Sequence, residues 1–472
     1  MRQRLRRVDL RFLFLVGMLV VVGSVVIGAD RPARVVSARL PVFPQGRFAP
    51  GDSLPDQQIR FYQDRLADNP RDALSWDMLA IGYMRRLRES GDPGYALRAE
   101  ESLHRALAAD PRDDQASSLL AWVALVKHEF ADAATRAEGL IRTSPSDDML
   151  YGILGDAEVE LGRYPEARQA LQRMMDLKPG PAAYTRAAYL RQLHGDIRGA
   201  IHLMEFAVEA ASPRDRETLA WTRVQLGNLY FGRGDLAGAE TQYAAALGVY
   251  PGYLYALAGL GGVRGAQGRF DDAIPLYEKS LAVIPLPVVA EALGDLYVRT
   301  GKQEEAERQF SLVEYIGRLT QLNRVVYNRD LAFFYADHRR HLDQAVALAE
   351  REATQRHDIY TDDTLAWADF QIGRFAEADR LIARALSLGT RDAQLLYHAG
   401  MIALGLGDHP RAARYLEQAL QTNPYFHILH AGEARRVLQN LRPGIPPGSF
   451  QLLPRQDREA SSKDGERKRI KP

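Results

Sequence analysis

Residues 226–251 read LGNLYFGRGDLAGAETQYAAALGVYP, and residues 254–285 read LYALAGLGGVRGAQGRFDDAIPLYEKSLAVIP. The two stretches repeat one another: Tyr243 recurs as Tyr277, 34 residues later, and the leucine–glycine pair, the glycine of the turn and the closing proline recur at the same distance. Small residues stand on both sides of each glycine-containing turn. The repetition predicts a chain built from one helical unit used many times.

The same period extends beyond these two units. Pro111, Pro145 and Pro179 follow one another at intervals of 34 residues, and each closes a unit because proline cannot continue a helix. This period and pattern resemble the tetratricopeptide repeat, in which each unit is a pair of antiparallel helices. The resemblance covers residues 57–441. It implies an all-α solenoid, a right-handed superhelix of about ten helix–turn–helix units over 56–441, ended by a capping helix over 427–441.

The N-terminal segment has the character of a membrane anchor. Residues 12–29 contain no charge, and 18 residues span about 27 Å as a helix, close to the minimum for a bilayer. Five arginines precede the segment and three follow it, which favours a cytoplasmic N-terminus and repeats outside the cytoplasm. We therefore predict a transmembrane helix in residues 1–29. A signal segment cleaved near Ala29, giving a soluble periplasmic or secreted protein, is the alternative, and reversed insertion would leave the repeats in the cytoplasm.

The remaining segments and the composition limit the function further. Residues 30–55 form a Pro-rich linker, and residues 442–472 are predicted to be a disordered tail. A formal net charge of +1 over 472 residues gives no reason to expect a nucleic-acid partner. The absence of cysteine excludes disulfides, thiolate metal sites and cysteine nucleophiles.

The resemblance implies that partners bind on the concave wall, which is lined by the first helix of each unit. The groove positions of the family carry aromatic and large side chains here, which are typical anchors for a protein partner. We select as the binding groove Met84, Trp122, Tyr189, Trp221, Asn228, Phe231, Tyr255, Phe333, Tyr360, Trp367, Phe370 and Tyr397. At the charged groove positions of the family pattern, which are not among these twelve residues, carboxylates outnumber arginines. A mildly acidic groove is therefore expected. The alternative for each residue is a place in the core between helices.

Three motifs could indicate catalysis. Residues 51–54 spell GDSL, a serine-esterase motif around Ser53, but no aspartate stands three residues before any histidine and no strand pattern flanks it. Two HxxH pairs, at 338/341 and 427/430, have a spacing that could hold a metal ion. Neither carries the glutamate of HExxH and a third ligand is not apparent, so we interpret these histidines as surface residues. The resemblance implies no catalytic machinery, cofactor or small-molecule substrate.

The favoured hypothesis is therefore a membrane-anchored scaffold that binds envelope proteins through its groove. A hydrolase or a metal-dependent enzyme is the rival from another class. Irregular spacing at 86–94 and 312–323 further predicts that units one to seven and units eight to ten form two blocks, bent relative to each other. The residues 311–322 are expected to extend their helix beyond the usual length.

Overall fold

The computed structural model describes residues 54–90, 92, 94–322 and 328–441. The predicted anchor or signal segment (1–29), nearly all of the Pro-rich linker and the predicted tail (442–472) lie outside these residues. Within the described ranges, every helix is too short or too polar to span a bilayer.

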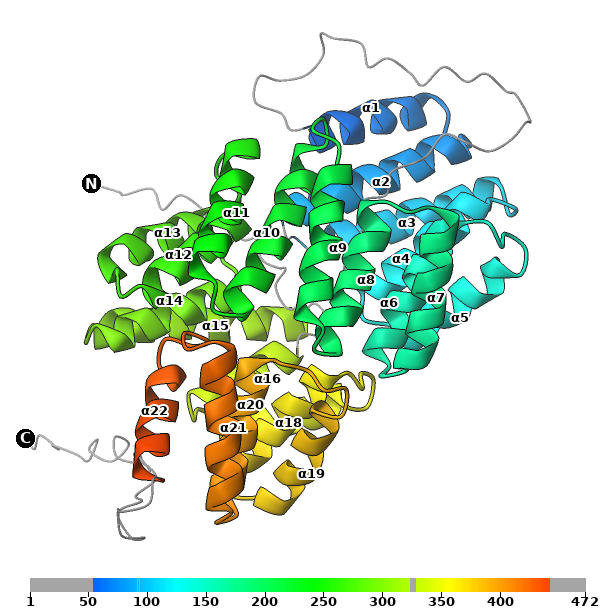
Figure 1. The fold of residues 1–472 in the computed structure, drawn as a ribbon. Coiled ribbons are helices and arrows are strands. Elements are labelled where there is room, and N and C mark those ends of the chain that lie inside the picture. The colour runs from blue at the N-terminus through cyan, green and yellow to red at the C-terminus, as the bar shows by residue number, and fades with distance from the viewer. Residues whose placement is uncertain (1–53, 91, 93, 323–327, 442–472) are drawn as a thin grey trace, which may run out of the picture.

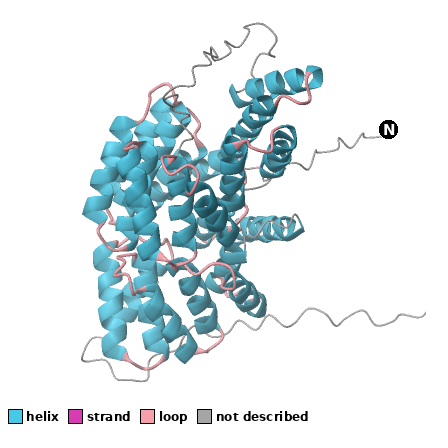
Figure 2. Cartoon of the chain, turned by 90° about the vertical axis from the view of Figure 1, so that its right-hand side faces the viewer, coloured by secondary structure: helices cyan, strands magenta, loops and turns pink. Residues whose placement is uncertain are grey.

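The described residues fold into helices joined by short loops, without a β-strand among them (Figure 2). The helices are α1 (Leu54–Asp68), α2 (Ala73–Ser90), α3 (Gly94–Ala109), α4 (Asp114–Val126), α5 (Phe130–Ile141), α6 (Asp148–Glu160), α7 (Tyr164–Leu177), α8 (Pro181–Leu193), α9 (Ile197–Ala210), α10 (Arg216–Gly232), α11 (Leu236–Val249), α12 (Leu254–Ala266), α13 (Phe270–Val283), α14 (Pro287–Arg299), α15 (Gln303–Leu322), α16 (Asn328–Asp337), α17 (Leu342–Glu352), α18 (Ile359–Gln371), α19 (Phe375–Ala385), α20 (Ala393–Gly405), α21 (His409–Thr422) and α22 (His430–Asn440).

From α2 to α21 these helices pair as ten consecutive hairpins, with α1 before the first and α22 after the last. The predicted all-α helical-repeat fold is therefore confirmed. Small residues permit the close pairing: a Cβ atom added at Gly155 would lie 2.3 Å from Leu171, and one at Gly294 would lie 2.4 Å from Phe310. At such distances a larger side chain would require the facing side chain or its helix to move.

The turn inside a hairpin uses a residue in the left-handed conformation, which ends the first helix of the unit. Glycine holds this position in most units, for example Gly195 (φ +75°) and Gly268 (φ +74°). His128 (φ 62°) takes it in the second unit. In several turns an aspartate follows: the carboxylate of Asp196 accepts the backbone N–H of Gly199 and caps α9. The recurring period thus has a mechanical cause, since the turns of units two to ten all use this backbone geometry.

The superhelix does not run on as a straight array, because units nine and ten fold back onto units three to five. The backbone N–H of His357 donates to the carbonyl of Glu160 (2.8 Å), and the Tyr164 hydroxyl accepts the N–H of Ile359 (3.0 Å). Further along, Asn423 Nδ2 donates to the carbonyl of Phe231 (2.9 Å). In Figure 1 the yellow and orange helices α18–α21 accordingly lie beneath the cyan and green helices α6–α10.

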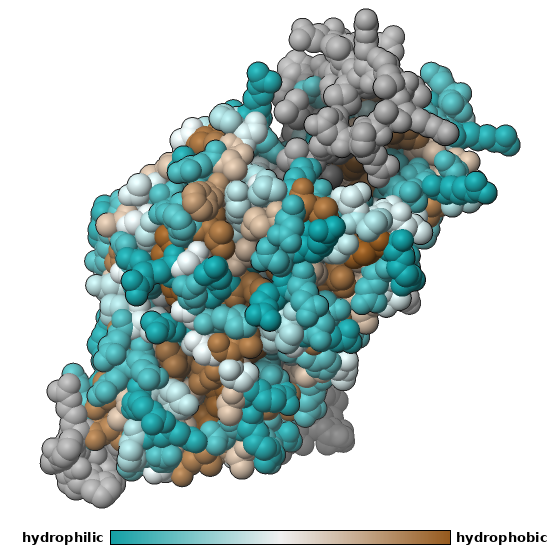
Figure 3. All heavy atoms as spheres, turned by 45° about the vertical axis from the view of Figure 1, so that its right-hand side comes forward, coloured by the Kyte–Doolittle hydropathy of each residue, from teal (hydrophilic) through white to brown (hydrophobic). Residues whose placement is uncertain are grey.

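This return of the chain buries apolar surface. One continuous core joins Val159, Leu171 and Leu193 of units three and four to Phe334 and Ile402 of units eight and ten. The helix α15 is 20 residues long, as the irregular spacing predicted. On the face in Figure 3, hydrophobic side chains lie in small groups separated by hydrophilic ones. Many hydrophobic side chains are thus used between helices and between the two turns of the superhelix.

Candidate functional site

A cavity of about 670 Å³ lies inside the superhelix. Its walls come mainly from the first helices of units four to ten, namely α8, α10, α12, α14, α16, α18 and α20, with Arg88 from α2. Trp221 and Phe231 project from α10, and Tyr255 projects from the next first helix, α12. First helices form the inner wall because each unit turns a little relative to the last, and the curvature places one helix of every pair inside.

Seven of the selected groove residues line this cavity: Tyr189, Trp221, Asn228, Phe231, Tyr255, Phe333 and Tyr360. They come from five different units, so no local sequence feature brings them together. Asn228 Oδ1 accepts the hydroxyl of Tyr243 (2.8 Å), which fixes the orientation of its amide on the wall.

The other five selected residues do not lie in the cavity wall. Met84 and Trp122 are buried in the core of the first units, while Trp367, Phe370 and Tyr397 are buried among units eight to ten, each at most 5% exposed. These five residues therefore belong to the core between helices, which was the alternative to a place in the groove. The physical reason is that a helix inside a solenoid is covered on both sides, and a phase difference of one position turns a side chain by about 100° from the groove into the packing.

The charged groups of the wall are nearly balanced rather than acidic. Five carboxylates face four guanidiniums across the lining. Arg88 pairs with Glu217 (3.0 Å), and Arg329 pairs with Asp358 (2.9 Å) behind the wall. Burial raises the pKa of Glu291 to about 8, although nearby His338 opposes the shift. The cavity therefore presents aromatic faces between paired charges.

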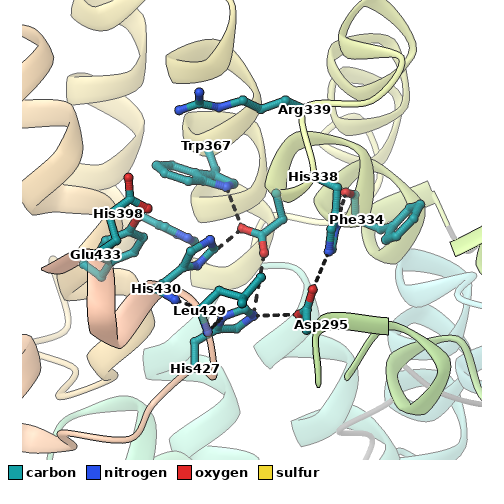
Figure 4. A network of polar contacts seen from close by, with 12 residues as sticks. Asp295, Phe334, His338, Arg339, Trp367, His398, His427, Leu429, His430 and Glu433 are labelled. Carbon is teal, nitrogen blue, oxygen red and sulfur yellow. Dashed lines mark hydrogen bonds and ion pairs between the residues drawn. The ribbon is translucent and has the colours of Figure 1, made fainter. Parts of the chain in front are cut away.

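Beside this cavity, histidines and aspartates form a buried cluster (Figure 4). His338 donates through Nε2 to Asp295 Oδ1 (2.8 Å) and through Nδ1 to the carbonyl of Phe334 (3.0 Å). A carbonyl can only accept, and an ionised carboxylate can only accept, so both ring nitrogens carry a proton and His338 is an imidazolium. Burial opposes the charge, but the bond to Asp295 raises the pKa of His338 to about 10.

The second HxxH pair joins the same cluster from the start of α22. His427 Nε2 lies 3.2 Å from Asp295 Oδ2 and 3.8 Å from Asp337 Oδ2, while His430 Nδ1 lies 3.7 Å from Asp337 Oδ1. The imidazole rings of His427 and His430 stack with centroids 4.2 Å apart. Trp367 Nε1 donates to Asp337 Oδ1 (3.0 Å) and holds the carboxylate in place.

Two more features complete the cluster. His398 contacts Asp363 Oδ1 through Nδ1 (2.8 Å) and stacks on Trp367 at 4.1 Å. Within the described part of the chain, His398 Nε2 and His430 Nδ1 are buried without a hydrogen-bond partner. Burial opposes ionisation of Asp337, but the neighbouring His430 and His427 hold the pKa of its carboxyl below the usual value.

The prediction that the paired histidines are surface residues is wrong for three of the four. His338, His427 and His430 are largely buried in the cluster, and only His341, whose side chain is 49% exposed, lies at the surface. The HxxH spacing was the feature of the sequence that could have indicated this buried cluster. The partners Asp295 and Asp337 were not recognisable, because they stand 132 and 90 positions before His427 in the chain. Ser53 lies outside the described residues.

Comparisons with known proteins agree with this architecture. A tetratricopeptide-repeat family model matches residues 119–181, 224–287 and 364–425. Cellulose synthase 2 operon protein C of Komagataeibacter xylinus is 30% identical over 209 residues, which are 44% of this chain and 14% of that protein. The chain therefore matches only a small part of this relative.

Among solved structures, the human IFIT1 dimer with PPP-AAAA shows 16% identity and a TM-score of 0.45, over 78% of this chain and 86% of that one. The Thermus thermophilus TPR protein TTC0263 shows 22% identity and a TM-score of 0.33, over 38% of this chain and 92% of that one. The family model matches tetratricopeptide repeats in three segments of the chain, and within these segments the helical hairpins recur at the expected period.

Proposed function

We propose that this protein is a scaffold that holds a segment of a protein partner in the cavity of its superhelix. The observation that carries the proposal is the convergence of seven aromatic side chains on one cavity, six of them from the first helices of five units. Aromatic rings offer large contact areas while losing little conformational entropy, which is why such residues dominate binding hot spots.

Size and charge support the same class of ligand. A volume of about 670 Å³ falls within the range of sites that enclose a compact ligand or a short chain segment. The nearly balanced charges of the wall suit a peptide with mixed side chains, whereas a polyanion would require an excess of cations. A hydrolase or a metal-dependent enzyme is the competing proposal, and ester turnover by the purified protein would favour it.

We further propose that residues 12–29 anchor the scaffold in a membrane with the repeats outside the cytoplasm. The uncharged stretch and the distribution of arginines support this arrangement. The relative's name adds a partner class to examine first, a polysaccharide-synthesising assembly, on the strength of 30% identity over 209 residues. Protease protection of the repeats in intact cells, followed by access after membrane disruption, distinguishes an external site from a cytoplasmic one.

The binding proposal is tested by placing a photo-crosslinking amino acid at Phe231 or Tyr255 in the cavity. The matched control is Phe206, which is 41% exposed on α9 and does not line the cavity. We expect one partner to be captured from the cavity positions and not from Phe206. With a purified segment of that partner, Trp221→Ala should weaken binding about tenfold or more while the circular dichroism spectrum is retained. Equal capture from all three positions would contradict the proposal.

A further inference from the structure

One carboxyl group of the cavity wall lacks a close partner. Glu291 lies on α14, one turn after Pro287 and Val288, and all three side chains line the cavity. Its carboxylate is 3.7 Å from His338 Nδ1, but that N–H already donates to the carbonyl of Phe334 (3.0 Å). Within the described part of the chain, Glu291 makes no hydrogen bond. The Glu291 carboxyl therefore reaches the cavity with its capacity to accept hydrogen bonds unused.

The charged groups around Glu291 leave it without a cation of its own. Asp295 stands one turn further along α14, Asp337 and His338 come from the last turn and end of α16, and His427 comes from the loop before α22. Even with both imidazole rings protonated, Asp295 and Asp337 balance their charges. An ionised Glu291 thus adds an uncompensated negative charge, and buried charges are normally paired.

The arginines of the wall do not supply this charge. Three of the four are held by other carboxylates, in the pairs Arg88–Glu217 (3.0 Å), Arg329–Asp358 (2.9 Å) and Arg356–Asp358 (3.2 Å). The fourth, Arg391, is exposed. The cation that fits Glu291 therefore comes from outside the chain.

The surroundings of Glu291 also suit the rest of a basic side chain. Tyr255 on α12 and Phe333 on α16 line the cavity from the first helices on either side of α14. The faces of aromatic rings attract ammonium and guanidinium groups. Pro287 and Val288 offer apolar contact to the methylene groups that carry such a charge.

We infer that Glu291 determines the specificity of the cavity by binding an ammonium or guanidinium group. This inference rests on the proposed function, in which the group is a lysine or arginine side chain of the bound partner segment. The incoming cation donates the charge-assisted hydrogen bond that Glu291 lacks in the free protein. The aromatic wall then contacts the apolar parts of the same segment.

Binding of the cation is coupled to the release of a proton. Burial raises the pKa of Glu291 to about 8, so the free protein keeps this carboxyl protonated at neutral pH. The cation binds the ionised form and lowers the pKa of Glu291 in the complex. Affinity should therefore fall about tenfold for each pH unit below 8 and stop changing above that value.

A small probe tests the site without a partner protein. Phenethylammonium joins an aromatic ring to a primary ammonium group, and 2-phenylethanol is its neutral counterpart of similar shape. Isothermal titration calorimetry of the full chain at pH 8.5 should show a preference of about tenfold or more for the ammonium, as expected for a hydrogen bond to a charged group. At pH 7, titrations in two buffers of different ionisation enthalpy should show that about one proton is released for each ammonium bound.

Glu291→Gln has the shape of the protonated side chain, and its circular dichroism spectrum should match that of the wild type. We expect this variant to bind the two probes equally and to release no proton. The control Glu138→Gln changes an exposed carboxyl on α5 that does not line the cavity, and it should behave as the wild type does. Equal affinity of the wild type for the two probes, or binding of neither, would overturn the inference.

A partner segment captured at Phe231 or Tyr255 provides the second measurement. Replacing its lysine or arginine by glutamine should weaken binding to the wild type about tenfold or more, and should hardly change binding to Glu291→Gln. An equal loss with both proteins would overturn the inference and leave the proposed function intact. Preferential binding of phenethylammonium without capture of any partner would support the cation site while contradicting the proposed function, so the two failures are distinguishable.

Discussion

The guanidinium of Arg356 donates to the carboxylate of Glu160, although the two residues stand 196 positions apart. Both side chains are 3% exposed, and Arg356 also lies 3.2 Å from Asp358. This contact joins the end of α6 to the start of unit nine. It is the polar centre of the interface through which the second turn of the superhelix rests on the first.

Replacing Arg356 should therefore open this interface. Arg356→Met leaves Glu160 buried without its cation, while Asp358 keeps its pair with Arg329, and we expect a loss of about 3–5 kcal/mol in the free energy of unfolding. The control Arg136→Met removes an exposed pair with Asp132 and should cost less than about 1 kcal/mol. Urea unfolding followed by circular dichroism measures both. Similar losses in the two variants would show that the interface adds nothing to stability.

Two turn glycines test the same interface without changing a charge. Gly195 and Gly268 hold corresponding places and have nearly equal φ, so alanine costs both about 1 kcal/mol of backbone strain. A Cβ at Gly195 would lie 2.3 Å from the carbonyl oxygen of Gly389, whereas one at Gly268 meets nothing within 4 Å.

We therefore expect Gly195→Ala to lose about 1–3 kcal/mol more than Gly268→Ala in the same urea experiment, because the added methyl group separates the two turns. If the turns were apart in solution, the two variants would be equally destabilised.

The close pairing of helices within a unit gives a third prediction. In Gly294→Ala the new methyl group would lie 2.4 Å from the Phe310 ring, and we expect a loss of about 1–3 kcal/mol. Gly248 is also helical, but its added Cβ has nothing within 4 Å, so Gly248→Ala should gain about 0.5–1 kcal/mol from helix propensity. Thermal unfolding midpoints should move in opposite directions; a shift of the same sign would refute the packing explanation.

A buried carboxyl in the first unit predicts a pH dependence of stability. Burial, with Asp113 beside it, raises the pKa of Asp77 to about 8. The folded protein thus keeps the Asp77 proton up to about pH 8, while the unfolded chain releases it near pH 4. The contribution of Asp77 to stability is therefore fully present below pH 4 and is lost progressively as the pH rises from 4 to 8.

Asp77→Asn cannot ionise and still offers a donor to Asp113. The variant should not show this decline in stability. The difference in the free energy of unfolding between Asp77→Asn and the wild type should therefore grow by up to about 1.4 kcal/mol per pH unit between pH 4 and pH 8. Urea unfolding at pH 5, 6, 7 and 8 measures it, with the exposed Asp64→Asn on α1 as the control. A gain that does not vary with pH would mean that Asp77 is already ionised in the folded state.

The sequence by itself determined the unit and its repetition. The recurrence of Tyr243 as Tyr277, and the glycines and prolines kept in register, fix where each helix begins and ends, because helix capping and close packing depend on residues near in sequence. The same pattern identified the inner wall, so that Trp221, Phe231 and Tyr255 were expected on it and line the cavity.

Only the tertiary structure decided how the units close on one another. Small rotations between neighbouring units accumulate along a solenoid, so whether Glu160 meets Arg356 depends on geometry summed over nearly six units. The same accumulation brought Asp337 to His427 and His430 and buried Trp367 between them, where the chain alone suggested surface histidines and a groove tryptophan. Local periodicity specifies helices, while contacts between distant units follow from superhelical pitch, which the sequence does not display.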